Sequence, residues 1–260
     1  MTLPLFQVDA FASAVFRGNP AAVVLLDQWL PDAVLQAIAA ENNLSETAFV
    51  VPEGADFRLR WMTPTVEVDL CGHATLAAGF VLLHDRDRVA FHTRSGALTV
   101  TREDGLYWLD LPALPPQAPV VAPDVVAALG VQPQALLGLR EVHHGRYLMA
   151  VLDDEAAVRD LRPDIRALGA LRTNVVVTAP GENVDFVSRF FAPASGVDED
   201  PVTGSTHASL TPYWAGRLGE ADLRAQQLSR RGGDLRCVLR GDRVRLGGQC
   251  ALYLTGKIWV

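Results

Sequence analysis

The sequence predicts an α+β fold made of two similar halves, each mostly strands packed around one apolar helix. Two stretches carry this prediction, VDLCGHATL at 68–76 and DEDPVTGSTHASL at 198–210, and both run from acidic residues through a glycine to His-Ala-Thr/Ser-Leu. The strand-like segments upstream also repeat, as FRLRWMTP at 57–64 and FVSRFFAP at 186–193. Because these matches keep their order along the chain, they indicate an internal duplication.

The first half is expected to contain short strands and two helices. AAVVLL (21–26) is an apolar run bounded by turn residues, and TAFVVP and FRLRWMTP are rich in β-branched and aromatic residues, so all three are predicted strands. PDAVLQAIAAENN has helical spacing and begins with Pro31-Asp32, a favourable helix start. HATLAAGFVLLHD is apolar nearly all round, which predicts a buried helix.

Two hairpins and one extended connection complete the expected arrangement. ALTVTREDGLYWLDLP and LRCVLRGDRVRLG each read as a hairpin, with Gly105 and Gly241 at the turns. The stretch 111–124 (LPALPPQAPVVAPD) is rich in proline and reads as an extended link. The expected halves are therefore residues 1–113 and 114–260, with their boundary inside this link.

Composition excludes several classes of function. The 260 residues carry a formal net charge of −7, which argues against a nucleic-acid groove or binding to an anionic membrane. The longest apolar runs are far shorter than the ~20 residues of a membrane span, and the first residues do not resemble a signal peptide. The three cysteines, Cys71, Cys237 and Cys250, form neither a CxxC pair nor a zinc pattern. We expect a soluble, cytoplasmic protein with reduced thiols and no metal.

The repeated stretch predicts a binding site for an anion. Gly72-His73 and Gly204-Ser205 stand where a turn ends and a buried helix begins. The first backbone N–H groups of a helix lack intrahelical partners and favour negative charge, and glycine lets a ligand approach the backbone. If the halves face each other, both helix starts point into one cleft and hold a carboxylate. His207 lies one turn further along its helix and is expected to be a core histidine.

Glu46, in NNLSETAFV, is the candidate acid/base residue. It begins an apolar strand, and burial would raise the pKa of a carboxyl group towards the range that suits proton transfer. The alternative is an ordinary exposed strand start. Its counterpart in the second half falls near Thr173, which favours one proton shuttle over two symmetric bases. Asp200 precedes Pro201 and the Gly204 turn, whereas Asp198 and Glu199 are expected to form a solvated loop.

Four motifs in the chain resemble the PhzF-like (phenazine-biosynthesis) isomerase family: VDAFASAVFRGNPAAVV, NNLSETAFV, CGHATLAAGFVL and EDPVTGSTHASL. The resemblance implies the diaminopimelate-epimerase-like fold, in which each half is a β-barrel-like sheet around a central helix. It also implies an active site in the cleft between the halves, and a homodimer.

The same resemblance assigns roles to individual residues. Glu46 matches the glutamate that moves a proton between carbons of a small cyclic acid such as trans-2,3-dihydro-3-hydroxyanthranilate, with neither cofactor nor metal. His73 and Asp200 match polar residues that hold the substrate and assist proton movement. Gly72, Gly204 and Ser205 lie at the helix starts that bind its carboxylate. The physiological substrate, and whether it is related to phenazines, stay open.

Two other functions are considered. Related epimerases and racemases use two cysteines, one from each half, on opposite faces of an α-carbon. Cys71 falls where the first would be, but the second half has no cysteine near Gly204, so this mechanism is disfavoured and Cys71 is expected to be a small buried residue. The other alternative is a non-catalytic small-molecule-binding protein with the same fold.

Overall fold

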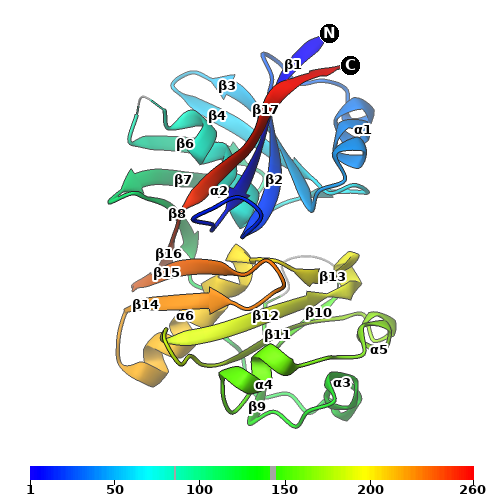
Figure 1. Cartoon of the computed structure of the whole chain (residues 1–260), viewed down its shortest axis with the longest axis vertical. Coiled ribbons are helices and arrows are strands. Elements are labelled where there is room, and N and C mark those ends of the chain that lie inside the picture. The colour runs from blue at the N-terminus through cyan, green and yellow to red at the C-terminus, as the bar shows by residue number, and fades with distance from the viewer. Residues whose placement is uncertain (85, 141–144) are drawn as a thin grey trace. The chain divides into compact units, whose positions relative to one another are not determined.

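The computed structural model describes residues 1–84, 86–140 and 145–260. The chain divides into two compact units, of which the first contains residues 1–111 with 246–260 and the second contains residues 112–245 (Figure 1). Strand β16 (Arg243–Gly248) crosses the boundary between them.

The first unit is a sheet that surrounds helix α2. Its elements are β1 (Thr2–Ala10), β2 (Asn19–Leu25), α1 (Asp32–Asn42), β3 (Glu46–Glu53), β4 (Asp56–Met62), β5 (Glu67–Val68), α2 (Gly72–Leu82), β6 (Arg88–Thr93), β7 (Gly96–Glu103), β8 (Leu106–Pro112) and β17 (Cys250–Trp259). The strands pair in the order β17-β1-β2-β3-β4-β6-β7-β8, with β5 also on β4. Helix α2 contacts β1, β2, β3, β7 and β17, which confirms a sheet wrapped around a central helix.

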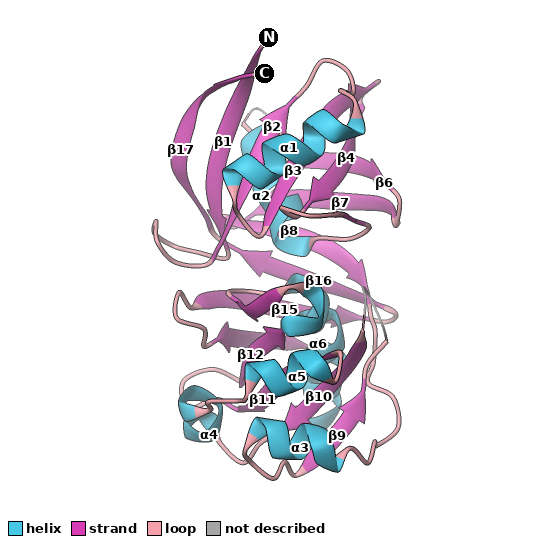
Figure 2. Cartoon of the chain, turned by 90° about the vertical axis from the view of Figure 1, so that its right-hand side faces the viewer, coloured by secondary structure: helices cyan, strands magenta, loops and turns pink. Residues whose placement is uncertain are grey.

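Helix α1 lies over the other face of this sheet (Figure 2). Its Leu35 and Ile38 pack with Val24 of β2 and Phe49 of β3 in one apolar cluster. Helices cover both faces of β2, so its consecutive residues 21–24 are all buried. This explains why the segment reads as a continuous apolar run instead of an alternating one.

The second unit repeats the strand pairing of the first. Its elements are α3 (Pro123–Leu129), β9 (Ala135–Gly138), β10 (Arg146–Val151), α4 (Glu155–Asp160), α5 (Ile165–Ala170), β11 (Thr173–Pro180), β12 (Phe186–Ala192), η1 (Pro193–Ser195), β13 (Val197–Asp200), α6 (Gly204–Leu218), β14 (Asp222–Gln227) and β15 (Gly233–Arg240). The parallel pairs β10–β11 and β12–β14 correspond to β2–β3 and β4–β6. The antiparallel pairs β11–β12 and β14–β15 correspond to β3–β4 and β6–β7. The duplication expected from the sequence is therefore visible in the topology.

Helix α6, the counterpart of α2, is packed against the sheet through Trp214 and contains an internal proline, Pro212. Trp214 stacks on Phe186 at 5.8 Å, and its Nε1 donates to Thr178 Oγ1 at 2.9 Å. Pro212 has no N–H to donate to the Ala208 carbonyl one turn earlier. The N–H of Leu114 donates to the Ala208 carbonyl instead, at 2.9 Å. This hydrogen bond holds the proline-rich link against the helix.

The unit boundary differs at the C-terminus from the one expected. Residues 246–260 belong to the first unit, whereas the sequence placed them with 114–260. The reason is that β17 pairs antiparallel with β1 along nearly the whole of that strand. The β7–β8 hairpin is confirmed, and its two turn residues, Asp104 and Gly105, both have positive φ, as a type I′ turn requires.

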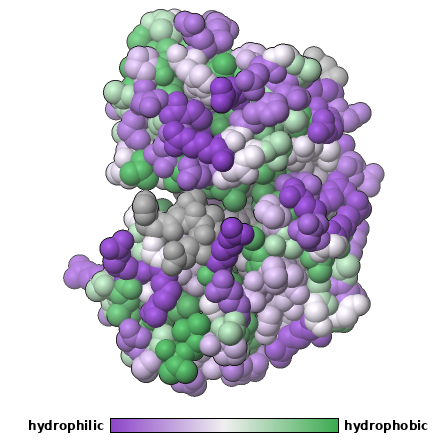
Figure 3. Space-filling view, turned by 180° about the vertical axis from the view of Figure 1, so that it is seen from behind, coloured by the Kyte–Doolittle hydropathy of each residue, from purple (hydrophilic) through white to green (hydrophobic). Residues whose placement is uncertain are grey.

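Hydrophilic residues are interspersed with hydrophobic ones on the face shown in Figure 3. No helix in the described ranges is both long and apolar enough to cross a membrane.

A substitution at Gly79 tests the close packing of α2 against the sheet. A Cβ at Gly79 would lie 2.6 Å from Cγ1 of the fully buried Val100 of β7. Overpacking costs about 1–3 kcal/mol and is partly offset by the ~1 kcal/mol gain in helix propensity, so Gly79→Ala should destabilise the protein by up to about 2 kcal/mol. Urea unfolding measures the change.

The matched control is Gly216→Ala in α6, where a Cβ would meet nothing within 4 Å. This variant should gain up to ~1 kcal/mol from helix propensity alone. Equal stabilisation by both substitutions would contradict the close approach of α2 to β7.

Candidate active site

Glu46 is the first residue of β3 and is held at the edge of the core. Helix α1 ends with Asn43 in the left-handed conformation (φ 49°), which turns the chain into β3. Glu46 then pairs with Ala21 of β2 in a parallel register. Its side chain is only 19 % exposed, so the alternative of an ordinary exposed strand start is wrong.

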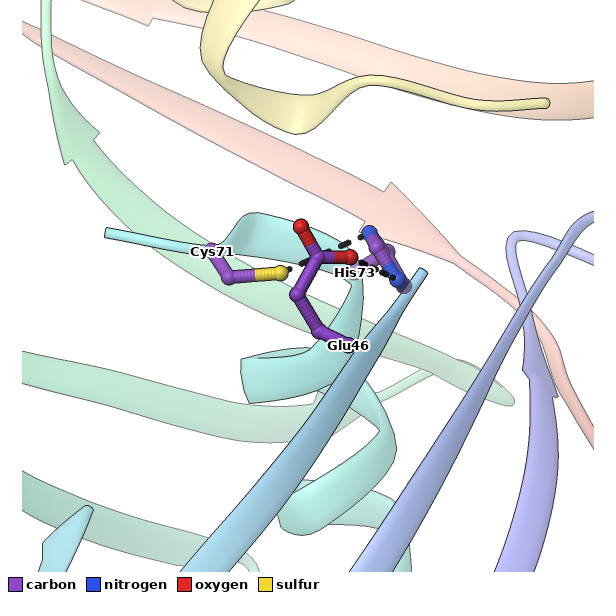
Figure 4. Close-up of side chains that lie close together, drawn as sticks. All are labelled: Glu46, Cys71 and His73. Carbon is purple, nitrogen blue, oxygen red and sulfur yellow. Dashed lines mark hydrogen bonds and ion pairs between the residues drawn. The ribbon is translucent and has the colours of Figure 1, made fainter. Parts of the chain in front are cut away.

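His73 lies in the first turn of α2 and faces this carboxylate. Its Nε2 is 3.2 Å from Glu46 Oε2 (Figure 4). His73 as a whole is 4 % exposed, because α2 is enclosed by the sheet. Burial lowers the pKa of His73 from 6.5 to about 3, so the imidazole is neutral at physiological pH. The contact is therefore between a carboxyl group and a neutral ring, and not a salt bridge.

The other ring nitrogen of His73 has two neighbours. Asn19 Nδ2 lies 3.1 Å from Nδ1, and Cys71 Sγ lies 3.6 Å from it. Asn19 is fully buried at the start of β2, and Cys71 is 6 % exposed just before α2. A polar chain thus runs from the start of β2 through His73 to Glu46.

The donor atoms of Glu46, Cys71 and His73 lie within 4.8 Å of one another, a spacing compatible with a metal ion. However, Cys71 approaches Nδ1 of the imidazole and Glu46 approaches Nε2. These two nitrogens direct their lone pairs away from each other, so one ion cannot take the ring, the thiol and the carboxylate without rearrangement. The geometry suits the handling of a proton better than the binding of a metal.

The start of α2 adds positive potential beside this group. Gly72 and His73 occupy its first turn, and the N-cap residue Cys71 makes no side-chain capping hydrogen bond. The first N–H groups of a helix lack intrahelical partners, so they favour a negative group near this end.

In the second unit, Asp200, Gly204 and Ser205 gather at the start of α6. Asp200 ends β13 and accepts a hydrogen bond from Thr203 Oγ1 through Oδ2. The buried Gln227 side chain joins the two ends of this turn, since it accepts from Thr203 N–H at 2.9 Å and donates to the Asp200 carbonyl at 2.7 Å. The turn that carries Asp200 to the helix is thus held from both sides.

The expected site residues therefore form two groups, one in each unit. Glu46, Gly72 and His73 form the first, and Asp200, Gly204 and Ser205 form the second. The single cleft that unites them stays a prediction. His207 is fully buried, its Nδ1 is 2.7 Å from the Thr203 carbonyl and its ring lies 5.9 Å from that of Phe186, as expected for a core histidine.

One expectation about the acidic loop is wrong. Glu199 is not simply solvated, because its carboxylate binds the guanidinium of the buried Arg189 through two bonds of 2.7 and 3.0 Å. Arg189 also donates to three backbone carbonyls, those of Val158, Arg159 and Leu161. Glu199 thus neutralises a cation in the core of the unit, whereas Asp198 is exposed as expected.

Sequence reasoning missed Asn19, Thr203 and Gln227. Asn19 stands inside the FRGNPAAVV motif, but a buried amide beside a proline reads as a turn residue when nothing indicates its partner. Gln227 lies 27 residues after Asp200, and no local pattern connects them. Only the parallel pairing of β12 with β14 brings this glutamine to the turn.

Buried histidines should make stability depend on pH. Below pH 6.5 the unfolded chain binds a proton at His207, whereas burial keeps the pKa of the folded ring at about 4. The unfolded state then binds more protons than the folded state. The free energy of unfolding therefore decreases as the pH is lowered, by up to ~1.4 kcal/mol per pH unit for this group.

His207→Gln should remove that contribution, and its stability profile between pH 6.5 and 4 should be shallower than that of wild type by the same slope. Urea unfolding at a series of pH values measures both profiles. Above pH 6.5, the usual histidine pKa, the stability profiles of wild type and His207→Gln should be parallel. Parallel profiles at lower pH as well would rule out a neutral buried His207.

The sequence model of the "Phenazine biosynthesis-like protein" family matches residues 8–256. A Pseudomonas aeruginosa protein named as an uncharacterized isomerase is 53 % identical over 263 residues, covering 99 % of both chains. A solved PhzF-family protein from Enterococcus faecalis is 47 % identical, with a TM-score of 0.94 and full coverage of both chains.

A more distant likeness supports the fold. A probable proline racemase from Agrobacterium radiobacter is only 11 % identical, yet 99 % of this chain superposes on 92 % of it with a TM-score of 0.67. The α+β, epimerase-like fold class is therefore confirmed. The chain belongs to the phenazine biosynthesis-like (PhzF) family and is an enzyme of the isomerase class.

Proposed function

We propose that this isomerase moves a proton between two carbons of a small cyclic carboxylic acid, with Glu46 as the acid/base and without a cofactor. The observation that supports it is the 3.2 Å contact between the largely buried Glu46 carboxyl group and the neutral His73 ring. A carboxylate can take a proton as a general base, and the imidazole beside it supplies a polar contact without a net charge.

Glu46 alone can both remove and return the proton in this reaction. The Glu46 carboxylate takes a proton from one ring carbon, and the electron pair of that C–H bond spreads into the adjacent double bonds and carboxyl group. Glu46, now a carboxylic acid, returns the proton to a different carbon, and the double bond shifts. No atom is gained or lost, and the residue ends as it began. This one-base scheme agrees with Thr173, the counterpart of Glu46, having no acid/base group.

The helix starts are the proposed binding elements for the substrate. The first turn of α2, with Gly72, and that of α6, with Gly204 and Ser205, present N–H groups suited to a carboxylate. Asp200 is proposed to hold a polar substituent of the substrate and to assist proton movement. A small-molecule carboxylate is therefore the expected ligand, and the cytoplasmic homodimer stays a prediction from the sequence.

The competing function is an epimerase or racemase that uses Cys71 as a base. One observation favours it, because Cys71 Sγ lies 3.6 Å from His73 Nδ1. Such an enzyme needs a second thiolate. Burial raises the pKa of the Cys237 thiol to about 12, and burial also raises that of Cys250, so both are protonated at neutral pH. The one-base shift therefore explains the described residues better.

Deuterium exchange tests the role of Glu46. Wild type in D2O with trans-2,3-dihydro-3-hydroxyanthranilate and a panel of cyclic carboxylic acids should place deuterium on a ring carbon, detected by NMR. Glu46→Gln should slow this exchange by about 10²–10⁴-fold, because the amide cannot accept the proton.

The control is Glu53→Gln, at the exposed end of the same strand, which should exchange at the wild-type rate. Exchange at an α-carbon that survives Glu46→Gln and is lost in Cys71→Ser would instead establish the thiol-based epimerase. Ligand binding without exchange on any acid tested would favour the non-catalytic binding protein.

Asp200→Asn tests the contribution of the second unit. If Asp200 touches the substrate, the variant should lose at least about tenfold in kcat/KM, as expected for one hydrogen bond to a charged group. Asp198→Asn, two residues earlier and exposed, is the matched control and should keep the wild-type value. Equal rates for both variants would remove Asp200 from the mechanism.

A further inference from the structure

The structure assigns a positioning role to Asn19. We propose that its amide holds His73 as the tautomer with the proton on Nε2, so that the neutral ring turns an N–H towards the Glu46 carboxyl group, 3.2 Å away, and is matched to an ionised carboxylate. The tautomer is a property of the resting protein. Its meaning for catalysis rests on the proposed function of Glu46.

The backbone around Asn19 leaves it little freedom. Asn19 is the first residue of β2 and pairs with Ala10 of β1. Gly18 before it has a φ of +63°, and a Cβ there would lie 2.1 Å from the Ala10 carbonyl oxygen, so only glycine fits. The amide is therefore carried by a tightly packed strand start and not by an open loop, and it is fully buried.

The position of this amide decides which ring nitrogen carries the proton. A neutral imidazole has one donor and one acceptor nitrogen. Asn19 Nδ2 is a donor only and lies 3.1 Å from Nδ1, so Nδ1 accepts. The Cys71 thiol on the same side is also a donor, which agrees with this assignment. The proton then lies on Nε2, the nitrogen that faces Glu46 at 3.2 Å.

The opposite orientation of the amide has a different chemical consequence. It would place Oδ1 beside Nδ1, so Nδ1 would carry the proton and Nε2 would become an acceptor. An acceptor 3.2 Å from a carboxylate oxygen would favour a protonated Glu46, because two lone pairs at this distance repel each other. One buried amide is thus linked, through one ring, to the protonation state of the proposed base, and the arrangement found here matches the base form.

Nitrogen NMR of ¹⁵N-histidine-labelled protein reads this tautomer directly and needs no substrate. In wild type at neutral pH, His73 should show a pyridine-like Nδ1 and a pyrrole-like Nε2, with its signals assigned by their loss in His73→Gln. A pyrrole-like Nδ1, or two equivalent imidazolium nitrogens, would overturn the proposal.

Glu46→Gln separates the effect of Asn19 from that of the carboxylate. Glutamine can present either its oxygen or its nitrogen to Nε2, so it imposes no tautomer. If Asn19 is the cause, the Nε2–H form should still predominate in Glu46→Gln by about tenfold, the bias expected from one buried hydrogen bond. Comparable amounts of the two tautomers in this variant would assign the control to Glu46 instead.

Asn19→Asp combined with Glu46→Gln replaces the hydrogen-bond donor beside His73 Nδ1 by an acceptor. At a pH where the new carboxyl group is ionised, it accepts from Nδ1 and should move the proton from Nε2 to Nδ1. The matched control is Asn174→Asp in the Glu46→Gln background, which puts the same change at a fully buried asparagine of the second unit. The control should leave the His73 signals unmoved.

Asn19→Leu with Glu46→Gln supplies a second variant if the aspartate impairs folding, which the backbone amide spectrum reveals. It removes the amide donor without adding a charge, and the preference for Nε2–H should fall well below tenfold, because only the weaker Cys71 thiol donor stays beside Nδ1. Persistence of the tenfold preference would overturn the role of Asn19. These NMR measurements are independent of the deuterium exchange. Failure of the proposed role of Asn19 can therefore be distinguished from failure of the proposed role of Glu46.

Discussion

The enclosure of an apolar helix by its own sheet is the constraint on which the rest of the first unit depends. Every residue of α2 from Gly72 to Gly79 is buried, and the approach of Gly79 to Val100 leaves no room for a side chain. A helix surrounded in this way has only its ends available to a polar ligand. Its N-terminal end has backbone donors without intrahelical partners and a favourable dipole. Placing His73 there brings a titratable ring to the edge of a core without a charged neighbour on the same helix.

Burial also explains why the polar groups form a chain and not separate contacts. An unpaired polar group in such surroundings costs about 1–3 kcal/mol. His73 meets this demand at Nδ1, beside Asn19, whereas its Nε2 lies 3.2 Å from Glu46 Oε2 without the geometry of a hydrogen bond. The same burial keeps the imidazole neutral, because an imidazolium would lose its hydration. The result is a carboxyl group beside a ring that stays neutral at physiological pH.

The two units show how one duplicated topology supports different chemistry. Glu46 and Thr173 both begin the second strand of a parallel pair, opposite Ala21 and Arg146. Thr173 is fully buried and donates to the Leu171 carbonyl, which is a purely structural use of the position. At the helix starts the difference is equally clear, since His73 faces a carboxyl group while His207, further along its helix, bonds the Thr203 carbonyl. Duplication therefore preserved the strand order and the central helix, and individual side chains diverged.

Much of this protein was determined by the sequence alone, because the features concerned are local. Hydrophobic periodicity identified the strands and the buried α2, the repeated Gly-to-His-Ala stretch revealed the duplication, and four short motifs identified the family. Glu46, Gly72 and His73 were found because they stand inside those motifs. Tertiary structure decided what depends on distant pairing: β17 joins β1 at the other end of the chain, Glu199 neutralises Arg189, and Asn19 meets His73 across 54 residues. The physical reason is that a hydrogen bond depends on where two backbones are placed, and a single sequence shows only which groups are able to form one.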